Sequence, residues 1–254
     1  DVLGSRGLGD VYKRQGIFGA NVMVSAEVKA NAMKVMQAIK ELREADPEMK
    51  RRFRVLVTTA GDPMPWANFV KEQGMIWMHV FPGVRTAARC KKAGVQVLIA
   101  SGHEGGMHTA WQPVHSMTLL PDIIEKFSDE NTLVCGTGGF CDGKSIAAAF
   151  AMGADGVQMG TRFVATEECD ADPAFKESYV HARKEDIEII QSPVGMPGRA
   201  IHSSFLEKVK AGLKRPKSCP FNCIKTCDVS RSPYCIMLAL YNAFRGRLEN
   251  GYAF

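Results

Sequence analysis

The alternation of apolar runs with helical patterns is the feature that most limits how this chain can fold. Apolar runs of β type stand at 17–24, 54–59, 75–80, 95–100, 132–136 and 155–159. Helical patterns follow these runs near 27–45, 64–73, 84–93, 117–128, 142–152 and 172–184. Several runs are continuously apolar, as expected when helices cover both faces of a parallel sheet. Such repeated βα units predict either a doubly wound sheet or a (β/α)₈ barrel.

Two glycine-rich strand ends favour the barrel. "GTGG" at 136–139 and "QMGT" at 158–161 lie one βα unit apart, and the first opens onto a helix predicted to begin near Asp142. Free backbone N–H groups at such turns and at a helix N-terminus attract phosphate. Barrels often build a phosphate site from the loops after strands 7 and 8. We therefore assign 132–136 and 155–159 to those two strands.

Counting backward from these strands makes 17–24 the third strand of a barrel. We expect a (β/α)₈ TIM-type barrel that lacks its first two βα units, with an open six-stranded sheet as the alternative. Residues 1–15 show no periodicity and are interpreted as a leader that is not native to the fold. The barrel then occupies residues 16–200. Residues 201–254 are expected to form a C-terminal segment with helices near 201–214 and 235–249.

Composition argues against several classes of protein. The formal charge of +5 is spread along the chain, and its short basic clusters lack interleaved aromatic residues, so we expect no nucleic-acid partner. No apolar run reaches the 18 residues of a membrane-spanning helix. The first 15 residues carry no secretion signal. A cytoplasmic protein with reduced cysteines is the expectation.

Four of the eight cysteines gather near the C-terminus with spacings of four, four and eight residues. These spacings match neither zinc ribbons nor ferredoxins, although four nearby thiols could hold zinc or an iron–sulfur cluster. We favour reduced thiols packed in a lid and keep a metal site as the alternative. The residues concerned are Cys219, Cys223, Cys227 and Cys235.

The stretch "SGHEGGMH" at 101–108 holds the densest group of reactive residues. His103 and His108 are five residues apart, which separates them around a helix, and Gly105-Gly106 oppose a helix. A zinc site is therefore disfavoured. A loop after a barrel strand is where catalytic residues lie, and a histidine can move protons near neutral pH. From the residues alone, a catalytic base and an ordinary surface turn remain open.

Four segments together resemble the nitronate monooxygenase family, which also includes the flavin-dependent enoyl-ACP reductases. They are "GANVM" at 19–23, "VTTAGDP" at 57–63, "EGGMH" at 104–108 and "GTGGFCDGKSIAAAFAMGADGVQMGTRF" at 136–163. The similarity runs in order from about Gly16 to Ala200, roughly three quarters of the chain. It implies an FMN-dependent oxidoreductase on a TIM-type barrel, acting on a small molecule.

The resemblance implies roles for particular residues. His108 matches the family's catalytic base, and His103 and Met107 lie on the substrate side. Met107 stands where the family usually has a glycine, so we expect its side chain to narrow that side of the flavin. The remaining matches concern the cofactor. Those expected to contact FMN are Asn21, Ser101, Gly106, Gly138, Gly139, Gln158, Met159, Gly160 and Thr161.

Two activities fit the resemblance. In the first, alkyl nitronates are oxidised with O₂ and a histidine base assists. In the second, NAD(P)H reduces the flavin, which then reduces an enoyl thioester. A flavin-free phosphate-binding barrel enzyme and an inactive truncated fragment are the further alternatives. A homodimer is an additional expectation.

Overall fold

The computed structural model describes residues 16–219, 221, 223–224 and 227–254. These residues belong to two compact units. The first unit extends to Gly102 and continues over Val114–Gln158, whereas the second contains His103–Pro113 and Met159–Phe254. The expected leader, residues 1–15, lies outside the described residues.

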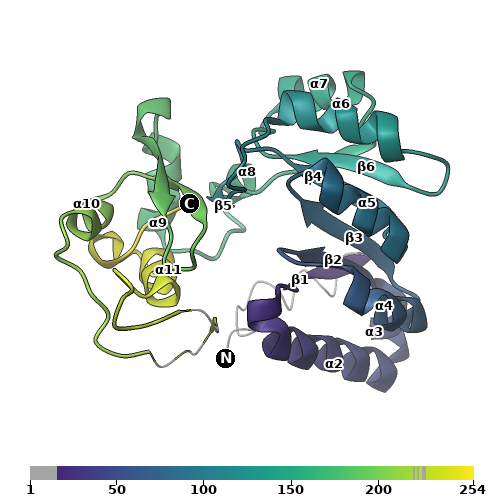
Figure 1. Ribbon diagram of the computed structural model, residues 1–254, viewed down its shortest axis with the longest axis horizontal. Helices are drawn as coiled ribbons and strands as arrows, with labels where there is room; N and C mark the ends of the chain where they lie inside the picture. Colours follow the sequence, from purple (N-terminus) through teal and green to yellow (C-terminus); the bar gives the residue numbers. More distant parts are fainter. Residues whose placement is uncertain (1–15, 220, 222, 225–226) are drawn as a thin grey trace. The chain divides into compact units, whose positions relative to one another are not determined.

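A curled parallel sheet of six strands forms the first unit (Figure 1). Its strands follow the chain in the order β1-β2-β3-β4-β6-β7, without a reversal. A doubly wound sheet changes direction at a switch point, so this order excludes that alternative and confirms the barrel type. The strands are β1 (Phe18–Met23), β2 (Phe53–Thr59), β3 (Ile76–Phe81), β4 (Val97–Ser101), β6 (Leu133–Thr137) and β7 (Gly156–Gln158).

Helices cover one face of this sheet (Figure 1). Gly74 caps the C-terminus of α4 and Gly94 that of α5, both in the left-handed conformation that glycine adopts without strain. Proline and aspartate begin α3, where the Asp46 carboxylate accepts the backbone N–H of Glu48. The helices are α2 (Lys29–Ala45), α3 (Pro47–Arg52), α4 (Ala67–Gln73), α5 (Val84–Ala93), α6 (Ser116–Phe127) and α7 (Gly143–Ala151).

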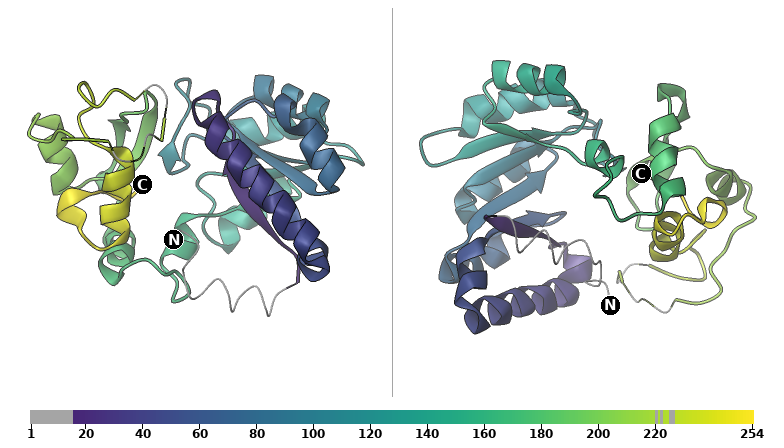
Figure 2. Two further views of the ribbon diagram at one scale, coloured as in Figure 1. Left: turned by 90° about the horizontal axis from the view of Figure 1, so that it is seen from below. Right: turned by 180° about the vertical axis from the view of Figure 1, so that it is seen from behind.

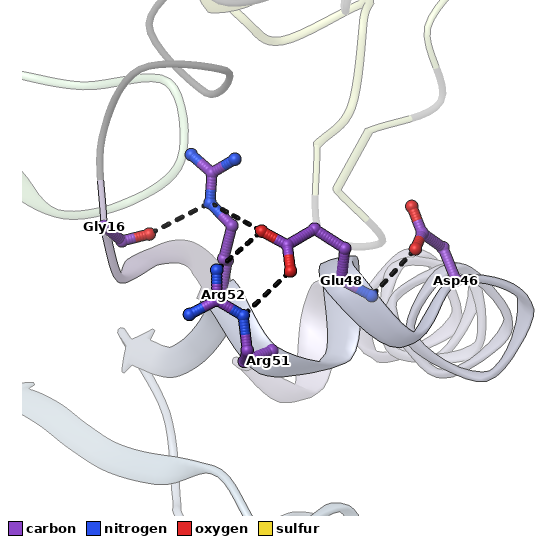
Figure 3. Close-up of polar contacts among 5 residues, drawn as sticks. All are labelled: Gly16, Asp46, Glu48, Arg51 and Arg52. Carbon is purple, nitrogen blue, oxygen red and sulfur yellow. Dashed lines mark hydrogen bonds and ion pairs between the residues drawn. The ribbon is translucent and has the colours of Figure 1, made fainter.

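Charged groups from both ends of α3 fix the corner between α2 and β2 (Figure 3). Arg51 Nε donates to the Glu48 carboxylate over 2.8 Å, and Arg52 Nε donates to the carbonyl of Gly16 over 3.2 Å. The buried Arg43 of α2 donates to the carbonyls of Lys50, Phe53 and Gln73. A buried guanidinium needs such partners, so Arg43 ties α2 to β2 and to the end of α4.

The core of the first unit lies between the sheet and its helices. Alternate residues of β2 and β3 are buried there, including Leu56, Trp77 and Phe81. Two polar residues share this face. Thr58 Oγ1 lies 2.7 Å from His79 Nδ1 and accepts the indole N–H of Trp77 over 2.8 Å. His79 therefore belongs to the helix-covered face and not to the opposite one.

The described residues of the second unit form an antiparallel sheet and four α-helices (Figure 2). Its strands are β5 (Met107–His108), β8 (Ile187–Gln191) and β9 (Pro197–Ile201), in the order β5-β9-β8. Its helices are α8 (Thr161–Val164), α9 (Pro173–His181), α10 (Ser204–Lys210) and α11 (Ile236–Phe244). The core joins Ile190 and Ala200 of the hairpin to Phe205, Ile236 and Tyr252.

The C-terminal helices are shorter than expected. We predicted helices near 201–214 and 235–249, but α10 ends at Lys210 and α11 at Phe244. In the first case β9 extends to Ile201, and Ser203 caps α10 by accepting the N–H of Leu206. In the second, Gly246 has a φ of 76°, which ends the helix. No described helix is long and apolar enough to cross a membrane.

Candidate active site

The predicted site residues are divided between the two units. The first unit contains Asn21, Ser101, Gly138, Gly139 and Gln158. The second contains the histidine loop and the residues that follow β7. These are His103, Gly106, Met107, His108, Met159, Gly160 and Thr161.

In the first unit, strand pairing places the predicted side chains on a single face of the sheet. Asn21 pairs with Val57, Val57 with Met78, and Met78 with Val97. Side chains alternate along a strand, so Ser101, four residues after Val97, points to the same side as Asn21. Ser101 pairs with Thr137, and Thr137 with Gln158. This face is opposite the helix-covered core, and Asn21 and Gln158 are exposed on it.

The carboxyl ends of three strands meet at one edge of this face. Thr137 Oγ1 donates to the carbonyl of Gln158 over 2.9 Å, and Gly102 N donates to the carbonyl of Thr137 over 2.9 Å. These bonds hold the ends of β4, β6 and β7 together. Ligands of parallel α/β sheets bind at this edge.

A glycine turn follows β6 at this edge. Gly138 and Gly139 have φ angles of 93° and 80°, values that residues with a side chain rarely adopt. Ser116 Oγ donates to the carbonyl of Gly138 over 2.7 Å and so fixes the turn from α6. The glycines let a ligand approach the backbone closely.

The N-terminus of α7 is already capped by a carboxylate. Asp142 Oδ1 accepts the N–H of Ser145 over 2.8 Å, and Ser145 Oγ accepts the N–H groups of Cys141 and Asp142. A carboxylate at this position competes with an anionic ligand for the positive end of the helix. The turn at 138–139, rather than the helix end, is therefore the better candidate phosphate contact.

In the second unit, His108 lies in the short strand β5 and is held on two sides. Its Nε2 lies 2.8 Å from Ser192 Oγ, and its ring meets the edge of Phe254 with centroids 5.6 Å apart. Burial lowers the pKa of His108 from its usual value, which favours the neutral imidazole. A neutral imidazole can accept a proton, as a general base must.

Met107 has an unusual backbone for a residue with a side chain. Its φ is 68°, in the left-handed region, and the residue is 49% exposed. Such a conformation favours glycine, the residue that the resemblance leads us to expect here. Gly106, just before it, is exposed and lies near the backbone of Phe254.

The residues after β7 form an open turn. The four-residue helix α8 begins at Thr161, and Gly160 is its N-cap residue. No side chain forms a capping hydrogen bond there. A Cβ atom added at Gly160 would meet nothing within 4 Å. Met159 and His103 are half-buried.

The four C-terminal cysteines are half-buried free thiols. Burial is the main cause that raises the pKa of Cys223, and the charges of the other three thiols add to it. Among the described histidines, cysteines, aspartates and glutamates, no group of three or more is arranged to hold a metal ion. Cys235 is the N-cap of α11.

Sequence reasoning missed Ser192 and Phe254. Ser192 lies in the connection between β8 and β9, and Phe254 lies more than 140 residues from His108 in the sequence. Neither belongs to a recognisable motif, because their role depends on pairing between distant segments. The Pro- and Gly-rich sequence "SPVGMPG" at 192–198 was the one available sign of a hairpin turn.

Parallel strands in sequential order, helices on one face and a glycine turn at the carboxyl edge define an α/β protein of the TIM-barrel type. A family model described as nitronate monooxygenase matches residues 16–236. The chain therefore belongs to the nitronate monooxygenase family, whose members are oxidoreductases.

Two curated relatives illustrate the similarity. The Mycobacterium tuberculosis (3aS,4S,5R,7aS)-5-hydroxy-7a-methyl-1-oxo-octahydro-1H-indene-4-carboxyl-CoA dehydrogenase is 34% identical over 148 residues, 57% of this chain and 40% of that protein. A probable nitronate monooxygenase of Staphylococcus saprophyticus is 30% identical over 149 residues, 55% of this chain and 41% of that protein. The chain thus spans about two fifths of the length of these relatives.

Solved structures show the same fold. FabK from Thermotoga maritima has a TM-score of 0.75 and 27% identity, covering 96% of this chain and 70% of that one. Nitroalkane oxidase from Streptomyces ansochromogenes has a TM-score of 0.64 and 21% identity, covering 93% of this chain and 74% of that one. The second likeness concerns the fold alone.

Proposed function

We propose that the protein is an FMN-dependent oxidoreductase that oxidises alkyl nitronates with O₂ and uses His108 as a base. The observation that carries the proposal is the environment of His108. The histidine follows a glycine loop, its ring is held by Ser192 and Phe254, and burial lowers its pKa. Membership of the nitronate monooxygenase family supports the same reaction class.

The residues of the first unit fit FMN. Asn21, Ser101 and Gln158 share the face of the sheet that its helices leave uncovered. The backbone N–H groups of the glycine turn at 138–139 would donate to the phosphate, since glycine has no side chain in the way and adopts the positive φ angles of this turn. Met159, Gly160 and Thr161 follow β7 directly in the chain, and the resemblance assigns them to the same phosphate.

When bound, FMN would supply the transfer of electrons to O₂. The chain would do the proton chemistry. His108 takes the proton from the carbon next to the nitro group of a nitroalkane, and the electron pair of that C–H bond gives the nitronate. A nitronate taken from solution already lacks this proton, so it does not need the base. The resemblance assigns His103 and Met107 to the substrate side.

Anaerobic reduction of the FMN-loaded protein tests this proposal. NADH, NADPH and a small alkyl nitronate are compared as reductants, and the loss of the absorbance of oxidised flavin is followed. We expect the nitronate to bleach the flavin at least tenfold faster than either nicotinamide. A protein that gains no flavin absorbance on titration with FMN would refute the cofactor, and with it the proposal.

A second candidate function is the NAD(P)H-dependent reduction of an enoyl thioester. The similarity to FabK, which covers 96% of this chain, favours it. Rapid bleaching by NADH or NADPH, together with reoxidation by a crotonyl thioester and none by O₂, would establish this activity instead. The same experiment thus decides between the two functions.

A further inference from the structure

Two contacts from the same unit fix the ring of His108. Ser192 Oγ lies 2.8 Å from Nε2, and the Phe254 ring packs against the imidazole at an interplanar angle of 64°. No described residue hydrogen-bonds to the other ring nitrogen, Nδ1. The two nitrogens therefore have different environments: one is tied to the protein and the other is available to a ligand.

Ser192 is itself held rigidly. Its side chain is buried, with 2% of the residue exposed. Its backbone N–H donates to the carbonyl of Met196 over 3.1 Å, and its carbonyl accepts the N–H of Gly195 over 3.0 Å. Its Oγ accepts the N–H of Val194 over 3.4 Å. A hydroxyl oxygen can accept two hydrogen bonds, so the same Oγ can also accept an N–H from His108.

Phe254 is held as firmly as Ser192. Its carbonyl accepts the hydroxyl of Tyr179 over 2.8 Å, and its ring meets that of Tyr252 with centroids 5.0 Å apart. Gly198, the strand partner of His108, leaves room for the Phe254 ring, because a Cβ atom there would lie 3.1 Å from Phe254 Cε1. The ring is thus confined next to the imidazole.

We infer that Ser192 and Phe254 are positioning residues that select the Nε2–H tautomer of His108 and make Nδ1 the atom that exchanges the proton. This inference rests on the proposed function in taking His108 as the base. The proton leaves the substrate carbon for Nδ1, and its electron pair stays on the carbon as the nitronate forms. The resulting imidazolium keeps its Nε2–H bond to Ser192 Oγ, which stabilises the positive charge.

Nitrogen-15 NMR of the protein labelled at histidine tests the tautomer directly. We expect the neutral His108 of the wild-type protein to carry its proton on Nε2 and to leave Nδ1 unprotonated. In the Ser192→Ala variant we expect a mixture of the two tautomers. Ser192→Thr keeps the hydroxyl and should restore the wild-type signal. Ser232→Ala, which removes another buried serine hydroxyl of the same unit, should leave the signal unchanged.

Kinetics provide a second readout. With a neutral nitroalkane, Ser192→Ala should lower kcat at least tenfold, leave KM within threefold and move the acid limb of the pH profile to lower pH. Gly198→Ala, which displaces Phe254, should lower kcat in the same way. A wild-type His108 protonated on Nδ1, or a Ser192→Ala variant with unchanged tautomer and pH profile, overturns the inference.

The failure of this inference can be told from failure of the proposed function. If His108→Ala turns over nitroalkanes as the wild type does, the base of the proposed function is wrong, even where NMR finds the Nε2–H tautomer. If His108→Ala is inactive while NMR finds the Nδ1–H tautomer, the base stands and the roles of Ser192 and Phe254 are wrong.

Discussion

At the scale of single residues, the chain departs from ordinary preferences where the proposed chemistry would take place. Met107 adopts a left-handed backbone, and the ring of the neighbouring His108 is desolvated. The antiparallel pairing of β5 with β9 holds both residues, because Met107 pairs with Arg199 and His108 with Gly198. Strain and desolvation of this kind are stable only when the surrounding structure holds them in place.

Replacing Met107 with glycine should stabilise the protein. The left-handed conformation is unfavourable for a side chain by about 1 kcal/mol, and glycine removes this strain. We expect Met107→Gly to raise the free energy of unfolding in urea. The control is Met117→Gly in α6, which is similarly exposed but helical and should lower that free energy by about 1 kcal/mol. Equal destabilisation by both changes would contradict the strain at Met107.

His79 should make stability depend on pH. Burial lowers its pKa to about 4, although the carbonyl of Gly61 and the charge of Asp62 oppose the shift. Between pH 6.5 and 4 the unfolded chain binds a proton that the folded chain does not. The free energy of unfolding should therefore fall as the pH falls, by up to about 3 kcal/mol. Urea unfolding across this range measures it. A His79→Asn variant should lose most of this pH dependence, and an unchanged slope would show that His79 is not its source.

At the scale of elements, the pattern of apolar residues was enough to predict the strands and helices of the first unit. The six apolar runs became the six parallel strands, and the predicted helix at 84–93 has the bounds of α5. The second unit was harder to predict. Strand β5 has two residues, and the turn between β8 and β9 is rich in proline and glycine, so neither has a periodic signal. Their pairing is a long-range event that local pattern does not encode.

Close packing between β1 and β2 makes Gly19 sensitive to substitution. A Cβ atom there would lie 2.5 Å from the carbonyl oxygen of Val55 and 2.7 Å from its Cβ, so backbone would have to move. We expect Gly19→Ala to lower the free energy of unfolding by about 2 kcal/mol. Gly143→Ala is the matched control, because a Cβ atom at that helix start meets nothing within 4 Å. A loss of similar size in both variants would contradict this account.

At the scale of the whole molecule, the sequence predicted the class of fold and only part of the candidate site. Asn21, Ser101 and Gln158 were proposed from the resemblance, and strand pairing gives them a common face. The capping of α7 by Asp142 was not foreseen, because "CDGKS" can be interpreted equally as a phosphate loop or as a capping box. Ser192 and Phe254 were missed because tertiary structure alone brings them to His108.

The central claim is that His108 is the base of an FMN-dependent nitroalkane and nitronate oxidation. Its most direct test is oxygen consumption by the FMN-loaded wild type and by His108→Ala, each with a neutral nitroalkane and with the nitronate prepared from it. With the nitroalkane, the claim predicts that the rate of oxygen consumption falls at least tenfold in the variant. The usual contribution of a general base would make this loss about 10²-fold or more. With the nitronate, the rate of the variant should stay within threefold of the wild-type rate. Equal rates with the nitroalkane, or equal losses with both substrates, would contradict it.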